Sequence, residues 1–155
     1  HTRKVLHAVE EVNEAQKQVL YRKLEKYYNG DLAGKTVALW GLSFKPETDD
    51  MREATSLVTI RLLQDSGCRV KVYDPVSMKE CRRRIGNSVE YAADMYEAVL
   101  EADALLLHTE WKQFRMPSWG VIKKAMKTPL VIDGRNIYDA EELKKLGFAY
   151  LSIGR

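Results

Sequence analysis

Two positively charged residues that follow short apolar runs have the clearest potential for chemistry. Lys45 lies in the polar stretch "GLSFKPETDDMREA", and Arg135 lies in the segment "VIDGRNIYD". An arginine can donate a bidentate pair of hydrogen bonds to a phosphate, while a lysine supplies a mobile positive charge. Together Lys45 and Arg135 predict a binding site for an anion, and phosphate is the anion that we expect. In the alternative, these cations only form surface ion pairs with neighbouring carboxylates: Asp49, Asp50, Glu53 or Asp133.

The elements that could bring these segments together follow from the hydrophobic pattern after residue 34. Short apolar runs such as "TVALW", "DALLLH" and "PLVID" alternate with stretches of helical periodicity. Several runs are apolar throughout, which is typical of strands buried on both faces of a parallel sheet. The predicted fold class is α/β: a Rossmann-like, doubly wound, mostly parallel sheet preceded by one long α-helix. Ligands of such sheets bind at the carboxyl ends of the strands, so the polar loop, "LLLHTEW" and "VIDGRNIYD" should converge there.

The predicted long helix occupies the start of the chain. Apolar residues recur at three- and four-residue steps from Val5 to Tyr28, and no proline or glycine interrupts them before Asn29-Gly30. That pair is expected to end the helix in a left-handed cap. The chain therefore divides into a helical part, residues 1–30, and an α/β domain, residues 31–155. Because nothing precedes the helix to cover its apolar side, we expect the chain to be part of a longer protein.

Composition argues against several other classes of protein. The net charge is only +3, and the one basic cluster, "KECRRRIG", has no interleaved aromatic residues, so no nucleic-acid partner is expected. Apolar runs fall far short of the roughly 20 residues that span a bilayer, so no membrane span is expected. The start of the chain has no apolar signal segment, which predicts a cytoplasmic protein. Cys68 and Cys81 fit no metal-binding spacing, so we expect no metal site and two reduced thiols.

Structural roles are expected for four further polar residues. Asp50 and Glu53 have the spacing of a capping box for a helix that starts near Met51. Asp74, in "VYDP", follows the second predicted strand, where dinucleotide-binding folds place a carboxylate on the ribose. The preceding loop lacks the G-x-G-x-x-G of such sites, so a turn and cap role for Asp74 is expected. His108 is expected to be a buried or rim histidine with satisfied hydrogen bonds rather than a general base.

A set of ordered motifs resembles the C-terminal part of the UDP-glucose/GDP-mannose dehydrogenase family: "VNEAQK", "GKTVALWGLSFKPETDDMREATSL", "VYDP", "TEW" and "VIDGRNIYD". The resemblance covers essentially the whole chain. It implies an NAD-dependent enzyme that oxidises the C6 hydroxyl of a nucleotide sugar to a carboxylate in two steps, through intermediates bound to a cysteine. The expected reaction is UDP-glucose to UDP-glucuronate. The family architecture implies an N-terminal NAD-binding domain, a long helix that forms a homodimer, and a C-terminal domain that closes over the UDP-sugar.

The resemblance also assigns roles to individual residues. Phe44, Lys45 and Arg135 match family positions that contact the nucleotide sugar. Arg52 matches the arginine that reaches the NAD bound by the other domain. Asn13 matches a helix position near the active site.

Two features of the family are missing from this sequence. The motif that carries the catalytic cysteine does not occur, and neither does the dinucleotide fingerprint, so the chain alone is expected to be inactive. UDP-N-acetyl sugars and GDP-mannose are alternative substrates. The chain could also serve only as a dimerisation and lid module, or bind NAD by itself, although the missing fingerprint argues against the last alternative.

Overall fold

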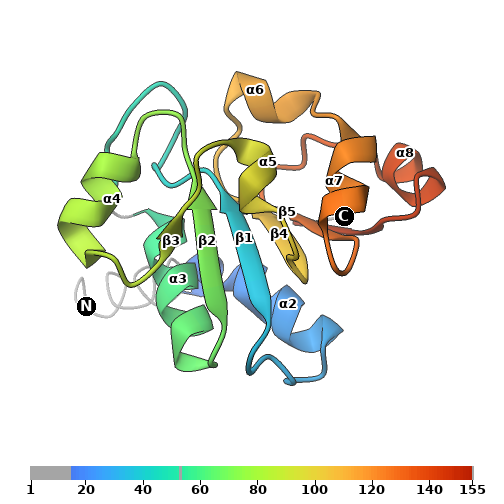
Figure 1. Ribbon diagram of the computed structural model, residues 1–155, viewed down its shortest axis with the longest axis horizontal. Helices are drawn as coiled ribbons and strands as arrows, with labels where there is room; N and C mark the ends of the chain where they lie inside the picture. The colour runs from blue at the N-terminus through green and yellow to red at the C-terminus, as the bar shows by residue number, and fades with distance from the viewer. Residues whose placement is uncertain (1–14, 53, 155) are drawn as a thin grey trace, which may run out of the picture.

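The computed structural model describes residues 15–52 and 54–154. The strands in these residues form a single six-stranded sheet (Figure 1). All the strand pairs are parallel, and the strand order is β3-β2-β1-β4-β5-β6. This is the strand order of doubly wound dinucleotide-binding folds, so the predicted Rossmann-like fold is confirmed. The strands are β1 Thr36–Trp40, β2 Arg69–Tyr73, β3 Glu90–Tyr91, β4 Ala104–Leu107, β5 Leu130–Asp133 and β6 Ala149–Ser152.

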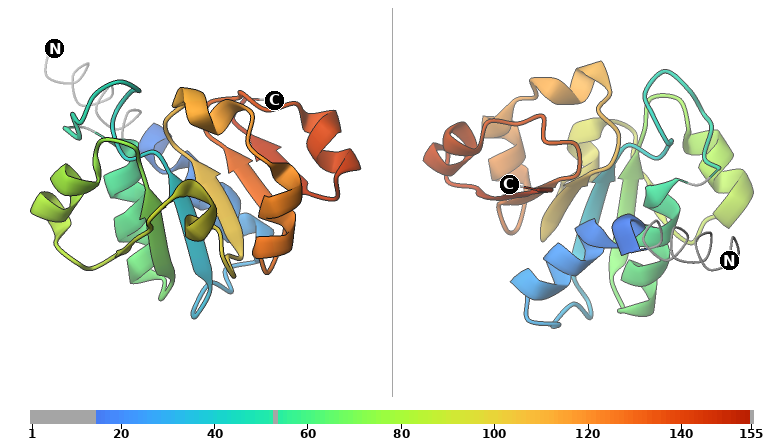
Figure 2. Two further views of the ribbon diagram at one scale, coloured as in Figure 1. Left: turned by 45° about the horizontal axis from the view of Figure 1, so that its top comes forward. Right: turned by 180° about the vertical axis from the view of Figure 1, so that it is seen from behind.

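Helices cover both faces of the sheet (Figure 2). They are α2 Val19–Tyr27, α3 Thr55–Asp65, α4 Met78–Ile85, α5 Met95–Ala98, α6 Lys112–Arg115, α7 Trp119–Ala125 and α8 Ala140–Lys145. In β4, Ala104 and Leu106 face the cluster beneath α2 and α3, whereas Leu105 and Leu107 face the cluster beneath α5 and α7. Because successive strand residues point to opposite faces, a strand covered on both sides must be apolar throughout.

The predicted long helix is confirmed in its second half, but it is interrupted by a turn near its middle. Residues 15–17 are helical, but a turn at Gln18 separates them from α2. The Gln18 N–H donates to the Ala15 carbonyl at 3.1 Å, the tighter spacing of a 3₁₀ turn. At the other end Asn29 has a φ of 53°, and the Gly30 N–H donates to the Glu25 carbonyl at 2.8 Å. The left-handed cap is therefore confirmed. The first half of the predicted helix, with Asn13, lies outside the described residues.

The capping-box prediction for Asp50 and Glu53 is wrong. Helix α3 begins at Thr55 rather than near Met51, and its N-cap residue, Ala54, has no side-chain cap. The Asp50 carboxylate instead accepts hydrogen bonds from the backbone and the guanidinium of Arg52. Glu53 lies outside the described residues. The polar loop is therefore longer than the capping signal suggested.

A glycine allows the carboxyl ends of β1 and β4 to lie close together. Gly41 has a φ of +94°, and a Cβ placed there would lie 2.5 Å from the Thr109 backbone nitrogen. Only glycine fits both this backbone conformation and this approach. After β1 the chain continues to β2 on one side of this pair of strands, and after β4 it continues to β5 on the other side. Ligands of doubly wound sheets bind at the carboxyl ends of strands where the order reverses in this way.

In the described part of the chain, no helix is both long and apolar enough to cross a lipid bilayer.

Candidate functional site

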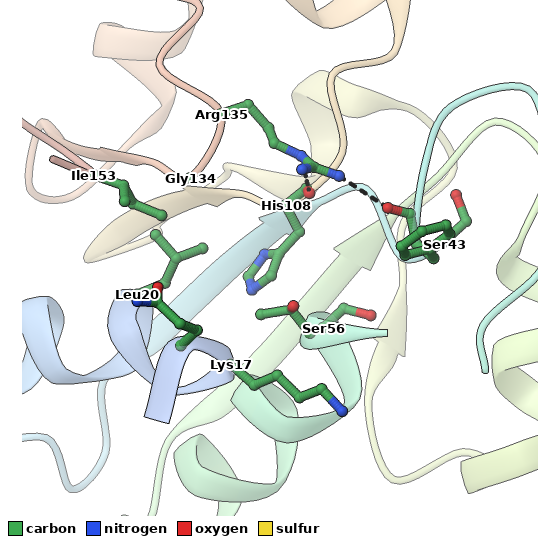
Figure 3. Close-up of a pocket in the computed structure, with 11 residues that line it drawn as sticks. Lys17, Leu20, Ser43, Ser56, His108, Gly134, Arg135 and Ile153 are labelled. Atoms are coloured by element: carbon green, nitrogen blue, oxygen red, sulfur yellow. Dashed lines mark hydrogen bonds between the residues drawn. The ribbon is translucent and has the colours of Figure 1, made fainter. Parts of the chain in front are cut away.

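A pocket of about 400 Å³ opens at the carboxyl ends of the strands, next to the junction of β1 and β4 (Figure 3). It lies where the sequence predicted a ligand. Residues from six segments form its walls: Gln16, Lys17, Leu20, Ser43, Phe44, Thr55, Ser56, His108, Gly134, Arg135 and Ile153. The lining combines two cations and three hydroxyl groups with apolar surface, which is a composition suited to a phosphorylated ligand that also carries an apolar ring.

Arg135 connects the loops that follow β1 and β4. Its Nε–H donates to the His108 carbonyl at 3.0 Å, and its Nη2 donates to the Phe44 carbonyl at 2.8 Å (Figure 3). Its Nε also lies 2.9 Å from Glu110 Oε2 in an ion pair. A guanidinium has five N–H groups, and two of them are used by the carbonyls, so three remain for a ligand among the described contacts. Arg135 is therefore both a loop connector and a possible anion-binding group.

Asp133 fixes the loop that carries Arg135. Its fully buried carboxylate accepts hydrogen bonds from the backbone N–H groups of Arg135, Ile137 and Tyr138 at 2.8 to 2.9 Å and from the Tyr150 hydroxyl at 2.8 Å. The suggested ion pair between the Arg135 side chain and Asp133 is therefore wrong, because Asp133 accepts the backbone N–H of Arg135 and the guanidinium pairs with Glu110.

Asp74 has a corresponding role at the end of β2. One carboxylate oxygen accepts from the Leu42 N–H at 2.8 Å and from Trp111 Nε1 at 3.1 Å. The other accepts from the N–H groups of Val76 and Ser77 at 2.9 and 2.8 Å. The predicted turn and cap role is confirmed. Since Asp74 is 1% exposed and accepts four hydrogen bonds, the described residues do not fit a ribose-binding site at this position.

His108 is a buried, neutral histidine in the pocket wall. Its Nε2 lies 2.9 Å from the Thr59 hydroxyl, whereas its Nδ1 has no hydrogen-bond partner among the described residues. The expectation of a fully satisfied histidine is thus correct for one ring nitrogen only. Burial, and secondarily the positive charge of Arg135, lower the pKa of His108 to about 3, against a smaller opposing effect of the Leu106 backbone. His108 therefore contributes no positive charge to the pocket near neutral pH.

The low pKa of His108 predicts a pH-dependent stability. An unfolded histidine has a pKa near 6.5, so below that pH the unfolded chain binds a proton that the folded chain refuses until about pH 3. Stability is therefore lost as the pH falls, and we expect His108 to cost about 2 kcal/mol between pH 7 and pH 5. Urea unfolding at both pH values should show this loss in the wild type and a smaller loss in His108→Gln. Equal losses in the two proteins would contradict the assignment.

Phe44 and Lys45 differ in their relation to the pocket. Phe44 lines it and is 53% exposed, although a ring of this size is usually buried. Lys45 is exposed, does not line the pocket, and forms no ion pair with any described residue. Its carbonyl accepts a hydrogen bond from the Ser43 hydroxyl at 2.8 Å. The structure thus brings Phe44 and Arg135 together but leaves Lys45 outside the pocket.

Arg52 lies in a different place from Arg135. Its guanidinium is 79% exposed and pairs with Asp50, which lowers the pKa of that carboxyl to about 2. Both residues line a separate shallow depression with Glu80 and Arg84. Within residues 15–52 and 54–154, no group of three or more potential metal ligands occurs.

Lys17 and Ser56 line the pocket but were not identified from the sequence. Lys17 is three residues before the buried Leu20, and both residues line the pocket. That spacing was the available signal for Lys17. Ser56 is at the start of α3, and its hydroxyl donates to the Leu42 carbonyl at 2.6 Å. No pattern in the sequence distinguishes it from other helix-terminal serines.

Comparisons with known proteins agree in pointing to one family. The sequence model described as "UDP-glucose/GDP-mannose dehydrogenase family, UDP binding domain" matches residues 38–140. The chain is 47% identical to the UDP-glucose 6-dehydrogenase of Pseudomonas aeruginosa over 97% of its own length and 34% of that protein. It is 46% identical to the enzyme of the same name from Rhizobium meliloti, over 93% of the chain and 33% of that protein. The chain thus spans about a third of the length of these relatives.

Solved structures give the same result. A UDP-glucose dehydrogenase from Pyrobaculum islandicum superposes with a TM-score of 0.78 at 32% identity, over 94% of this chain and 31% of that one. A UDP-D-ManNAc dehydrogenase from Pyrococcus horikoshii superposes with a TM-score of 0.70 at 26% identity, over 92% of this chain and 31% of that one.

Proposed function

This chain belongs to the UDP-glucose/GDP-mannose dehydrogenase family, and we propose that it is the UDP-sugar-binding part of a UDP-glucose 6-dehydrogenase. The complete protein would oxidise UDP-glucose to UDP-glucuronate with NAD as the oxidant. UDP-glucose is favoured over other nucleotide sugars because the relatives at 40 to 47% identity carry the name UDP-glucose 6-dehydrogenase.

The observation that carries this proposal is the position of Arg135 in the pocket wall. The residue lies at the carboxyl ends of the strands and keeps N–H groups that no described residue occupies. A diphosphate offers the oxygen acceptors that such a planar cation binds best. Phe44 provides an exposed aromatic ring beside it, against which a base or sugar can pack. Lys45, one residue further along the exposed loop, would reach the diphosphate by a movement of its side chain.

We propose further that NAD is held mainly by an N-terminal domain of the same protein. Two features of the described residues argue against a dinucleotide site here. The loop after β1 has no G-x-G-x-x-G, and the buried Asp74 carboxylate has its oxygens occupied. The exposed Arg52 would contact that NAD from the side of this domain. In this proposal residues 1–30 contribute to a homodimer, and the enzyme acts in the cytoplasm.

Calorimetric titration with UDP at low ionic strength tests the proposed function. We expect saturable binding of UDP, much weaker binding of uridine, which lacks the phosphates, and no heat with NAD. Lys45→Ala should weaken UDP binding about three- to tenfold at low salt and less at high salt, because an exposed charge is screened.

Lys127→Ala is the matched control for this titration. It removes an exposed lysine that lies before β5, at the amino end of the strand whose carboxyl end leads to Arg135, and should leave the affinity for UDP unchanged. Absence of binding at millimolar UDP, or equal affinities for UDP and uridine, would contradict a phosphate site in this chain.

A further inference from the structure

The ion pair between Glu110 and Arg135 places a carboxylate beside the proposed anion-binding group. Glu110 Oε2 lies 2.9 Å from Arg135 Nε, and the two side chains are 25% and 34% exposed. By charge alone, this carboxylate opposes the binding of a phosphate, because it cancels part of the positive charge of the guanidinium. Glu110 is not among the residues that line the pocket but contacts one that is, so its effect on a ligand would pass through Arg135.

The backbone on both sides of Glu110 is fixed by buried side chains. The Thr109 hydroxyl donates to the Ser43 carbonyl at 2.7 Å, which fastens the β4 loop to the β1 loop. Trp111 Nε1 donates to the buried Asp74 carboxylate at 3.1 Å, which fastens the same loop to the end of β2. Glu110 thus extends from a segment that is held immediately before and immediately after it. A carboxylate on such a support can orient the side chain it pairs with.

The contacts of Arg135 show what this orientation provides. The His108 and Phe44 carbonyls accept from Nε and Nη2, but both are neutral acceptors on loops. The Glu110 carboxylate adds a charged partner: its Oε2 lies 2.9 Å from Nε, the nitrogen whose single N–H is donated to the His108 carbonyl. We propose that Glu110 is a positioning residue that holds the Arg135 guanidinium in the plane in which its remaining N–H groups meet the ligand phosphate. The identity of that ligand rests on the proposed function above.

The charge of Glu110 and its positioning of Arg135 predict opposite effects of Glu110→Gln on UDP affinity. If charge dominated, the variant would bind UDP more tightly than the wild type. Positioning predicts that it binds UDP about three- to fivefold more weakly, in line with the strength of partly exposed ion pairs, and binds uridine unchanged. In an Arg135→Lys background the same change should alter UDP affinity less than about twofold, because the group that Glu110 positions has been replaced. Glu90→Gln, which removes the carboxylate partner of Arg69 at the opposite edge of the sheet, is the matched control and should have no effect.

A measurement without ligand separates this inference from the proposed function. In a ¹⁵N-correlated NMR spectrum, the Arg135 Nε–Hε signal, assigned by its loss in Arg135→Lys, should be resolved and slow to exchange with solvent in the wild type. It should exchange at least about tenfold faster in Glu110→Gln. An unchanged signal overturns the positioning role whether or not UDP binds. Equal or tighter UDP binding by Glu110→Gln, or equal weakening for UDP and uridine, also overturns it. If the wild type binds no UDP while the signal depends on Glu110, the positioning of Arg135 stands and the proposed ligand is rejected.

Discussion

Arg135→Ala is expected to weaken the binding of UDP by about 100-fold. Hydrogen bonds to charged groups are worth roughly 1.5–3 kcal/mol each, and about 1.4 kcal/mol corresponds to a factor of ten in affinity. The substitution removes the phosphate-binding group and also releases the Phe44 and His108 carbonyls, which Arg135 holds at 2.8 and 3.0 Å. The loss of the phosphate-binding group and the release of the two loops both weaken UDP binding. Calorimetric titration measures the loss of affinity, and unfolding by urea measures the loss of stability that follows from releasing the loops.

Two further variants show whether the loss of UDP affinity is specific to the Arg135 guanidinium. Arg135→Lys keeps the charge but not the planar fork, so an intermediate loss of about tenfold is expected. Arg69→Ala removes an exposed arginine that pairs with Glu90 at the other edge of the sheet, and it should leave UDP affinity unchanged. A loss below about threefold for Arg135→Ala would show that the pocket binds phosphate by other groups or not at all.

Asp74→Ala is expected to lower the free energy of unfolding by about 3–5 kcal/mol. The carboxylate is 1% exposed and accepts four hydrogen bonds, from Leu42 after β1, from Val76 and Ser77, and from Trp111 after β4. Its removal leaves several buried donors without an acceptor, and each unsatisfied donor costs roughly 1–3 kcal/mol. Because the loops after β1 and β4 both depend on it, the pocket should lose its shape as well as its stability. Urea-induced unfolding followed by circular dichroism measures the change.

The matched control for this prediction is Asp139→Ala. Asp139 is also an aspartate that accepts backbone N–H groups, from Glu141 and Glu142, but it is exposed at the N-terminus of α8. Loss of an exposed cap typically costs about 1 kcal/mol. If Asp74→Ala cost no more than Asp139→Ala, the buried carboxylate would not be the connection between strand ends that its contacts indicate.

The sequence by itself determined the elements, their parallel arrangement and the family. These follow from local patterns: strands buried on both faces must be apolar throughout, and a helix that ends in a left-handed turn favours Asn or Gly there, as at Asn29-Gly30. The turn role of Asp74 was also predictable from a local pattern, since the loop after β1 lacks the glycine-rich sequence that a ribose site at "VYDP" would require. The carboxyl ends of the strands could also be chosen as the place for a ligand, because that rule depends only on the fold class.

Only the tertiary structure decided which side chains meet at those ends. Arg135 and Phe44 are 91 residues apart in the sequence, and no local pattern records the hydrogen bond between them. The ion-pair partner of Arg135 proved to be Glu110 rather than Asp133. Helix α3 begins at Thr55, and Asp50 accepts hydrogen bonds from Arg52 instead of capping it. The presence of Lys17 in the pocket and the placement of Lys45 outside it were likewise decided by packing. The spacing of apolar residues along the chain determines whether a segment is a helix or a strand, whereas contacts between distant loops depend on how the whole sheet assembles.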